Sequence, residues 1–450
     1  MMHILFISMF VTLGLVMSNV VASSEVITDM NATEKAGKTA YEIWREKRLD
    51  AYSKYRSEYL ERYNNYRLDI VRRWGIPELS DATNYVSYSD DLSKKVVIDY
   101  DNNQIRVSVL EKQDSPAEID IEHELGKLAR RTVKTALADD PVMAQSGNND
   151  TRSLLGSVLG ELLGSVSEEG GAGSSAASAT LAKNARVEVV PLPLSAASEA
   201  VVQQQVLKES QGQTTSSPRS DELNKNQKAI SEAFAKARKQ QSKEKHRIRT
   251  YVVALPEDTM LKRAVHYVQP IAVSAKKYGL EPALVYAITQ TESAFNPLAR
   301  SHIPAFGLMQ IVPSSAGVDV NKLLNKSGRA PAVDILLNAE ENIKFGTAYL
   351  HILNSRYLSQ ITNEESRLYC MIAAYNTGSG NVASVFHPQG KKRIKAAAQV
   401  INSLSPDEVY ARLLKELPYE ETRRYLKKVN TAMKKYQNAL DHGQVLRQGA

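Results

Sequence analysis

The sequence is poor in the residues on which several common kinds of site depend. Only one cysteine is present, Cys370, which excludes an intrachain disulfide and any cysteine-cluster metal site. The 8 histidines are scattered, and no HExxH pair occurs at helical spacing, so metal chemistry has no support. No internal repeat long enough to indicate a solenoid is visible either.

The composition that remains is that of a globular chain. With 43% hydrophobic and 24% charged residues, the protein is predicted to be soluble and folded rather than disordered or membrane-spanning. Its 450 residues suffice for one large or two ordinary domains. The net charge of +7 suits an acidic polymer with free peptide carboxylates, but nucleic acid would suit it equally well, so charge alone selects neither.

The N-terminal residues have the pattern of a secretory signal peptide. The stretch from Ile4 to Met17 is almost wholly apolar, and the small residues around Ala22 are typical of a cleavage site before Ser23. The apolar stretch is too short to favour a stable membrane span. We therefore predict a signal peptide over residues 1–22, although its basic flank is weak and an uncleaved signal that acts as an anchor stays open.

A stripe of tyrosines follows in a long helical stretch from about Lys35 to Trp74, which Gly75 and Pro77 end. The stripe falls at steps of three and four, on one face of a helix, and consists of Tyr52, Tyr55, Tyr59, Tyr63 and Tyr66. Such a face can stack on sugar rings or pack against the protein's own core. We favour packing, since stripes at helical spacing usually indicate burial.

The next segment changes to the period of β-strands. Val96, Ile98 and Tyr100 alternate, DNNQ supplies a turn, and alternation resumes at Ile105, which together predict a β-hairpin. Residues 119–138 are predicted to form an amphipathic helix, and residues 248–255 a strand that returns to the hairpin's sheet. These elements predict a small α+β accessory domain over residues 30–254.

Two segments of this domain have unusual composition. Residues of about 145–185 are rich in Gly, Ser and Ala, which predicts a flexible insertion. The run from Lys225 to Arg249 is strongly basic. It could hold an anionic polymer or a membrane surface, but a solvated helix face is the more common structure of such a run.

The most informative residue is Glu292. Pro282 suits the first position of a helix, Leu284 and Ile288 recur on one face, and Pro297 ends it, so Glu292 lies in the last turn of an apolar helix. Apolar surroundings and the partial negative charge of a helix C-terminus both raise the pKa of a carboxyl group. A carboxyl that stays protonated near neutral pH can donate a proton to a leaving oxygen.

The rest of the C-terminal part is predicted to be helical. We expect helices near residues 258–278, closed by Gly279, near 340–355, through Cys370 into AYN, and near 421–436. No convincing strand core is visible, although a small β-like lobe around residues 317–335 stays open. The catalytic domain is assigned to residues 255–440, with a tail at 441–450.

Three further motifs accompany Glu292 in order: GLMQ from Gly307, AYNTG from Ala374, and LPYEETRRYLKKV from Leu417. Together the four motifs resemble the family-1 lytic transglycosylases, whose SLT catalytic domain is an all-helical relative of goose-type lysozyme. The resemblance covers about Leu261 to Tyr436. Stretches such as NKSGRAP and RRWGIPELSDATNYVSYSDD look most like the membrane-bound lytic murein transglycosylase C subgroup.

The resemblance implies a fold and a reaction. It implies a mainly α protein, with a helical lysozyme-like catalytic domain after the small α+β domain. Family members cleave the β-1,4 bond between N-acetylmuramic acid and N-acetylglucosamine in peptidoglycan without water, because the muramic acid 6-hydroxyl attacks its own anomeric carbon and leaves a 1,6-anhydro end. A single acid/base can serve this intramolecular reaction, whereas most glycosidases need two carboxylates. No cofactor and no metal are expected.

Carried over by motif, the resemblance assigns a role to each site residue. Glu292 would be the catalytic acid/base, and Glu421 would support the cleft. The expected substrate-binding residues are Ser293, Met309, Gln310, Tyr375, Asn376 and Tyr425. Ser293 would bind or orient, Tyr375 would steady the acid or the developing charge, and Tyr425 would offer a stacking face for a sugar ring.

This chain departs from the pattern at several points. SHIPAFG stands before LMQ where relatives often carry a second Ser, so the loop over the cleft is expected to differ, and Arg423 and Arg424 could simply pair with Glu421. No Cys follows the signal, although the subgroup is usually lipid-anchored there. We therefore expect a periplasmic protein, with peripheral membrane association and envelope protein partners left open. Peptidoglycan glycan strands are the expected partner, and nucleic acid is not.

Two other functions stay open at this point. A goose-type lysozyme would use the same acid with water as the nucleophile. A non-catalytic peptidoglycan-binding envelope protein would use the basic and tyrosine-rich parts for binding. The nature of the product ends separates the first alternative, and replacement of Glu292 separates the second.

Overall fold

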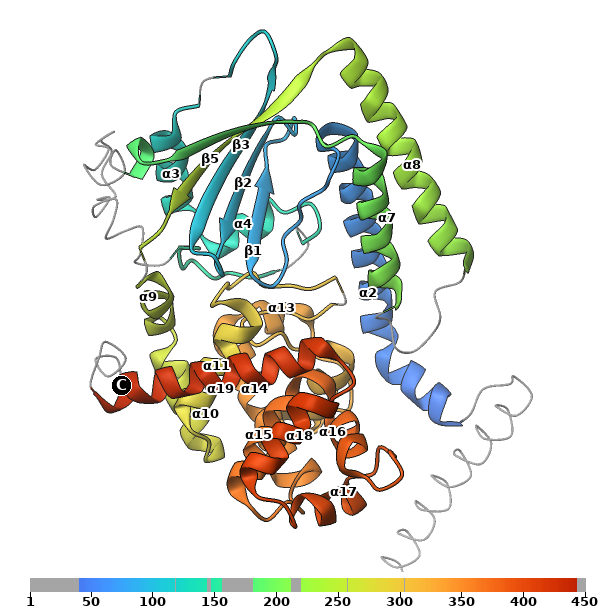
Figure 1. Cartoon of the computed structure of the whole chain (residues 1–450), viewed down its shortest axis with the longest axis vertical. Helices are drawn as coiled ribbons and strands as arrows, with labels where there is room; N and C mark the ends of the chain where they lie inside the picture. The colour runs from blue at the N-terminus through green and yellow to red at the C-terminus, as the bar shows by residue number, and fades with distance from the viewer. Residues whose placement is uncertain are drawn as a thin grey trace, which may run out of the picture.

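In a computed structural model of the chain, residues 40–117, 119–143, 147–155, 181–211, 220–256, 258–302 and 304–442 are described. They form a five-stranded antiparallel sheet with flanking helices, above a larger helical part (Figure 1). The fold prediction, mainly α with a small α+β unit before the helical part, is confirmed. The predicted signal peptide, the tail beyond residue 442 and most of the predicted insertion lie outside the described residues.

The N-terminal part contains the sheet. Its elements are α2 (Ala40–Trp74), β1 (Asn84–Tyr88), β2 (Lys94–Asp99), β3 (Gln104–Lys112), α3 (Ile121–Arg130), α4 (Val133–Ala138), β4 (Arg186–Pro191), α7 (Ala196–Gln211), α8 (Ser220–Lys243) and β5 (His246–Ala254). The strand order is β1-β2-β3-β5-β4. Ile98 lies opposite Ile105 in the predicted hairpin, and β5 pairs with β3 as predicted.

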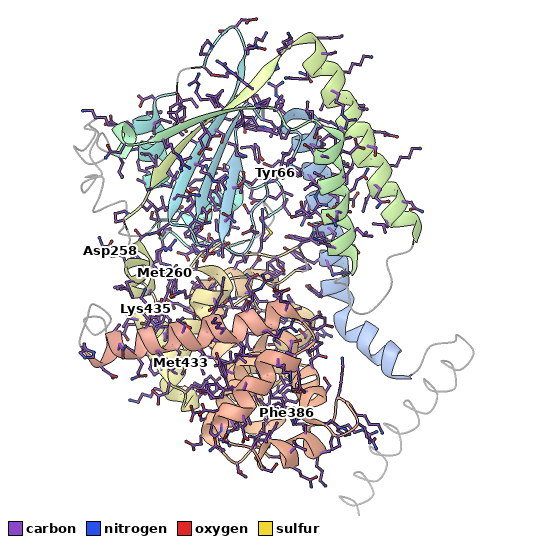
Figure 2. The ribbon with its side chains drawn as sticks, in the orientation of Figure 1. Tyr66, Asp258, Met260, Phe386, Met433 and Lys435 are labelled. Carbon is purple, nitrogen blue, oxygen red and sulfur yellow. The ribbon has the colours of Figure 1, made fainter. Side chains whose placement is uncertain are left out.

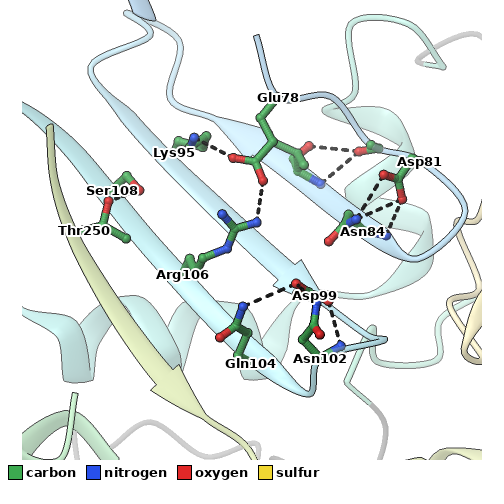
Figure 3. Close-up of polar contacts among 12 residues, drawn as sticks. Glu78, Asp81, Asn84, Lys95, Asp99, Asn102, Gln104, Arg106, Ser108 and Thr250 are labelled. Carbon is green, nitrogen blue, oxygen red and sulfur yellow. Dashed lines mark hydrogen bonds and ion pairs between the residues drawn. The ribbon is translucent and has the colours of Figure 1, made fainter. Parts of the chain in front are cut away.

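Polar side chains connect neighbouring strands on one face of this sheet (Figure 3). The Glu78 carboxylate accepts from Lys95 Nζ at 2.6 Å and also from Arg106, so it joins β2 to β3. The Ser108 and Thr250 hydroxyls lie 2.9 Å apart and join β3 to β5. These contacts fix the register in which β5 leads the chain into the helical part.

The helical part follows β5 directly. Its elements are α9 (Thr259–Val265), α10 (Val268–Tyr278), α11 (Pro282–Ser293), the π-helical turn η1 (Pro313–Gly317), α12 (Val318–Asn325), α13 (Val333–Leu337), α14 (Ala339–Ile352), the turn η2 (Leu353–Tyr357), α15 (Glu364–Thr377), α16 (Ser379–Phe386), α17 (Ile394–Ile401), α18 (Pro406–Glu416) and α19 (Glu420–Asp441). The long helix α19 crosses this part beneath the sheet (Figure 1). The predicted helices near 340–355, through Cys370 and near 421–436 correspond to α14, α15 and α19.

Several predicted elements are divided differently in the structure. The single helix over 119–138 is wrong, because Thr132 caps a second helix with its side chain and separates α3 from α4. The helix over 258–278 is interrupted between α9 and α10. The segment 317–335 contains α12 and the start of α13 rather than a β-like lobe.

The tyrosine stripe of α2 is a packing face, as we favoured. Tyr59 is fully buried, and its ring meets Phe306 of the helical part edge-on at 5.9 Å between centroids. The Tyr59 hydroxyl donates to the backbone oxygen of Ser301 at 3.4 Å. Tyr66, labelled in Figure 2, instead packs edge-on against Tyr88 in β1. The stripe therefore joins α2 to the loop that follows α11 and to the sheet.

The basic run is mainly a solvated helix face, also as favoured. Helix α8 buries Ile230 and Phe234 against Val71 of α2 and Val202 of α7. Its lysines are exposed. Arg238 instead pairs with Glu199 at 2.5 Å. The lysines of this helix thus face solvent rather than the core.

One apolar core runs through both parts of the molecule. It extends from Ile98 and Ile105 of the sheet through Leu255 to Ile288 of α11 and Leu426 of α19. The predicted domain boundary near residue 255 falls between β5 and α9, but the shared core means that the division into two domains stays a prediction. Among the helices that the structure describes, none is both long and apolar enough to cross a membrane.

Candidate active site

Helix α11 places Glu292 at the edge of the core. Pro282 occupies its first turn, and a left-handed residue, Ala294 at φ 49°, ends it. Phe295 also has a positive φ of 62°, so the chain turns away sharply after the helix. Most of α11 is fully buried, but Glu292 itself is partly exposed. Glu292 therefore lies in the last turn of an otherwise buried helix, as predicted, and retains only partial exposure.

Two neighbours from α19 act on the Glu292 carboxyl in opposite directions. Burial raises its pKa from the ordinary 4.5 to about 8, the hydrogen bond from Tyr425 lowers it, and the negative charge of Glu421 raises it. The Tyr425 hydroxyl donates to Glu292 Oε1 at 2.7 Å. With a pKa of about 8, roughly nine carboxyl groups in ten carry a proton at pH 7. The group is a weak acid poised near neutral pH.

These opposing effects predict opposite shifts in two variants. Tyr425→Phe removes a hydrogen bond that stabilises the carboxylate, so the pKa of Glu292 should rise. Glu421→Gln removes a like charge, so the same pKa should fall. A ¹³C NMR titration of the Glu292 side-chain carboxyl measures both shifts. Equal shifts in one direction would contradict the arrangement, and Glu340→Gln, an exposed change on α14, serves as the control.

The GLMQ motif is a tight turn rather than the start of a helix. Gly307 has φ 76°, and a Cβ atom there would lie 2.3 Å from Leu336 O, so the turn requires glycine. Gln310 has φ 47°, and its amide donates to Gly307 O at 2.9 Å. The Ser293 hydroxyl, on α11, donates to Leu308 O at 2.8 Å and so holds the turn beside Glu292.

Asn342 supports this turn from α14, a role that no sequence motif indicated. Its amide nitrogen donates to Phe306 O and Leu336 O, both at 2.7 Å, and its oxygen accepts from Met309 N at 2.7 Å. Asn342 is fully buried. A buried amide with three such bonds fixes the backbone of the turn, because any of these backbone groups left buried without a hydrogen bond would lower the stability of the fold. The signal that could have found it is a polar residue on the buried face of the helix.

Tyr375 connects α15 to the same turn. Its hydroxyl donates to Met309 O at 2.8 Å, and its ring packs at 5.5 Å against that of Tyr349. Burial raises the pKa of Tyr375 well above its ordinary range, and the charge of Glu292 adds to this effect. Tyr375 thus remains a neutral donor close to the acid. Asn376 accepts from the Thr422 hydroxyl at 2.7 Å, which joins the end of α15 to α19.

Three of the residues that were expected to contact a ligand are buried in the structure. Ser293 and Met309 are fully buried, so in this conformation they hold the turn and cannot touch a bound molecule. Tyr425 is 6% exposed and uses its hydroxyl on Glu292, so it does not present a stacking face. Gln310, Tyr375 and Asn376 are partly exposed and can be reached.

Glu421 is exposed in the first turn of α19 and is not neutralised by its arginine neighbours. Arg424 pairs with Glu420 at 3.5 Å, and Arg423 donates to Leu417 O. Among the described residues, no ion pair to Glu421 is formed. The pairing that the sequence left open is thus absent here, and the carboxylate of Glu421 remains available to act on the acid.

The N-terminal part holds the loop between α11 and the GLMQ turn. The Asn296 amide donates to Ala82 O at 3.1 Å. Arg300 Nη1 lies 2.8 Å from Asp140 Oδ2, and both side chains are less than a tenth exposed. The loop that connects the acid to the turn is therefore anchored at two points outside the helical part.

The match to a known protein family lies in the helical part. Residues 269–398 match the family model for the "Transglycosylase SLT domain". Over 191 residues, the chain is 47% identical to the "Membrane-bound lytic murein transglycosylase C" of Photorhabdus laumondii and 46% identical to the protein of that name from Yersinia pestis. Each alignment covers 42% of this chain and 52% of the relative, so the chain spans about half the length of these relatives. The resemblance inferred from the motifs is confirmed for this region.

The comparison with solved structures gives weaker matches. The lytic transglycosylase Slt of Pseudomonas aeruginosa is 20% identical to this chain. The alignment covers 56% of this chain and 37% of the Slt chain, with a TM-score of 0.32. The 70 kDa soluble lytic transglycosylase of Escherichia coli is 18% identical, covers 57% and 38%, and has a TM-score of 0.29.

Proposed function

We propose that this chain, whose residues 269–398 match the Transglycosylase SLT domain, is a lytic transglycosylase that cleaves the β-1,4 bond between N-acetylmuramic acid and N-acetylglucosamine. The observation that carries the proposal is Glu292, a partly exposed residue at a helix end, whose carboxyl pKa burial raises to about 8 and whose Oε1 accepts a hydrogen bond from a tyrosine. Gln310 and Tyr375 also lie within the matched residues. Gln310 belongs to the GLMQ turn beside Glu292, and the Tyr375 hydroxyl donates to Met309 O of that turn.

The proposed reaction needs one acid/base and no water. Protonated Glu292 donates its proton to the glycosidic oxygen as the bond from that oxygen to the anomeric carbon breaks. The resulting carboxylate then takes the proton of the muramic acid 6-hydroxyl, while that oxygen bonds to the anomeric carbon. The proton that Glu292 gives up is thus replaced, and the products are an N-acetylglucosamine end and a 1,6-anhydro end.

Tyr425 suits both halves of this cycle. Because its hydroxyl donates to Oε1, the arrangement favours the acidic proton of Glu292 on Oε2, the oxygen that would then face the glycan. The same hydrogen bond stabilises the carboxylate that forms next. We assign Tyr425, Ser293 and Met309 as positioning residues, and Gln310, Tyr375 and Asn376 as the residues that contact the glycan.

The proposed setting is the cell envelope. The relatives are named membrane-bound lytic murein transglycosylases, and peptidoglycan strands are the substrate that we propose for this chain. The expected signal peptide would deliver it to the periplasm. Its net charge of +7 is suited to a polymer that carries free peptide carboxylates.

A goose-type hydrolase is the second candidate, and Glu421 is the observation that favours it. This exposed carboxylate is close enough to raise the pKa of Glu292. A second carboxylate beside the acid could orient a water molecule for attack on the opposite face of the sugar. The two candidates differ in their products, because attack by water leaves a reducing end.

Mass spectrometry of the fragments released from purified peptidoglycan distinguishes the candidates. We expect products that carry 1,6-anhydro ends. If the wild-type protein releases fragments with reducing ends, it is a hydrolase. The Glu421→Gln variant should then release no fragments with reducing ends. If no fragments are released at all, the result supports a non-catalytic peptidoglycan-binding protein instead. Digestion with an authentic lysozyme provides the reference for reducing ends.

A further inference from the structure

A cavity of about 530 Å³ lies between the C-terminal part of α2, strand β1 and the segment that follows α4. Tyr66, labelled in Figure 2, belongs to its wall, and Tyr85 and Tyr88 of β1 complete the aromatic part of the lining. A cavity of this size can hold a small molecule or a few residues of a peptide. Glu292 does not line it, so the cavity is separate from the candidate active site.

The cavity nevertheless adjoins the loop that follows the helix of the acid. Asp140 lines the cavity, and its carboxylate pairs with Arg300 of that loop at 2.8 Å. The cavity therefore lies on the side of the N-terminal part that holds the connection between Glu292 and the GLMQ turn.

Most charged side chains of the wall are already paired, but Arg73 is not. Asp69 pairs with Arg72, and Asp139 pairs with Arg131 at 2.9 Å. Arg73 makes no hydrogen bond and no ion pair among the described residues. Its Nε is buried, whereas Nη1 and Nη2 retain accessible surface. These two nitrogens form the end of the guanidinium, and their parallel N–H donors match the two oxygens of a carboxylate.

A free anion lines the same cavity. Asp90 is exposed in the turn between β1 and β2 and has no partner among the described residues. The neighbouring Asp91 makes the hydrogen bonds that hold this turn, with Ser89 and Ser93. Because the turn does not need the carboxylate of Asp90, that group is available to an amine. The Tyr66 hydroxyl also makes no hydrogen bond among the described residues.

We propose that this cavity binds the peptide part of peptidoglycan, with a carboxylate on Arg73 and an amine at Asp90. Such peptides carry free carboxylates and, at a diamino acid, a free amine. The tyrosine rings of the wall suit the methyl and methylene groups between these charges. The choice of this peptide rests on the function proposed above. The N-terminal part thus holds the peptide, while the helical part holds the glycan.

Isothermal titration of the full chain with the soluble tripeptide alanyl-γ-glutamyl-diaminopimelate tests the proposal without any cleavage. We expect a Kd of about 1 mM or tighter. The same peptide with its carboxylates amidated, or with its amines acetylated, should bind at least about tenfold more weakly, because each loses a charge-assisted contact. Equal binding of all three peptides, or no binding of the free one, would overturn the proposal. Binding of the free peptide by a chain that releases no 1,6-anhydro products would keep this site and refute only the reaction.

Two variants assign each charge of the peptide to its residue. Arg73→Met should bind the free and the amidated peptide equally, and Asp90→Asn should bind the free and the acetylated peptide equally. Arg56→Met is the matched control, because Arg56 is another arginine of α2 without a partner among the described residues and does not line the cavity. It should distinguish the three peptides as the wild type does. Circular dichroism verifies the fold of each variant. If folded Arg73→Met still prefers the free peptide to the amidated one, the carboxylate binds elsewhere and the assignment is wrong.

Discussion

Replacing Glu292 with Gln should reduce the release of glycan fragments by roughly 10²- to 10⁴-fold, the usual contribution of a positioned acid/base. Gln retains the shape of the side chain and an oxygen that can accept from Tyr425, but it has no proton to donate. Fragment release from purified peptidoglycan, followed by mass spectrometry, measures the effect. Glu340→Gln, an exposed change on α14, should release fragments at the wild-type rate. Full activity in Glu292→Gln would exclude the proposed acid.

The Glu292→Gln substitution should lower activity but raise the free energy of unfolding at high pH. A loss of activity in this variant can therefore be distinguished from a loss of the folded structure. The pKa of Glu292 is raised from 4.5 to about 8 in the folded state, so the folded protein holds this proton more tightly. Its contribution to stability is therefore complete below pH 4.5 and is lost as the pH rises through 8. At pH 9, Glu292→Gln should be more stable than the wild type by about 2 to 4 kcal/mol. Urea unfolding at pH 5 and pH 9 should show this gap only at the higher pH.

The second large effect concerns the buried ion pair between Asp140 and Arg300. Asp140→Asn should lower the free energy of unfolding by about 3 to 5 kcal/mol, because Arg300 would be left buried without its counter-charge. Asn can still accept from the backbone nitrogens of Val142 and Met143, as Asp140 does, so the local turn is kept. Urea unfolding followed by circular dichroism gives the value.

Two further variants distinguish this explanation from a general intolerance of the turn. Asp139→Asn changes the adjacent residue, which pairs with Arg131 at 2.9 Å on the surface, and should cost less than about 1 kcal/mol. The double variant Asp140→Asn/Arg300→Met should recover part of the stability that Asp140→Asn loses, since no unpaired charge remains. If the double variant is less stable by the full sum of the two single effects, the pair is not coupled.

Local patterns predicted local structure well. Pro282 at the start and Pro297 beyond the end were enough to place Glu292 in the last turn of α11, because helix termini depend on the residues themselves. The alternation around the hairpin likewise predicted β2 and β3. Strand β1 and strand β4 were missed. They are short edge strands, and β4 is exposed on both faces, so neither needs the apolar alternation that a buried strand shows.

What the sequence could not indicate is which distant side chains meet. Tyr425 was expected to stack on a sugar, yet it is buried and bonded to a residue 133 positions earlier. Ser293 and Met309 carry the motifs but face inward, since their place is set by the packing of α14 and α15 around the turn. The support from Asn342 and Asp140 comes from other elements, and no local period reports such contacts.

The contact between α11 and α19 has a consequence for the order in which the chain becomes active. Glu292 leaves the ribosome long before the helix that carries Tyr425 and Glu421, because α19 is the last helix among the described residues. Until α19 packs against α11, the acid lacks both groups that adjust its pKa, and the side chains of α11 that face α19 have no cover. A partly synthesised chain therefore holds the acid without its tuned environment. The competence of the site arises only when synthesis is almost complete.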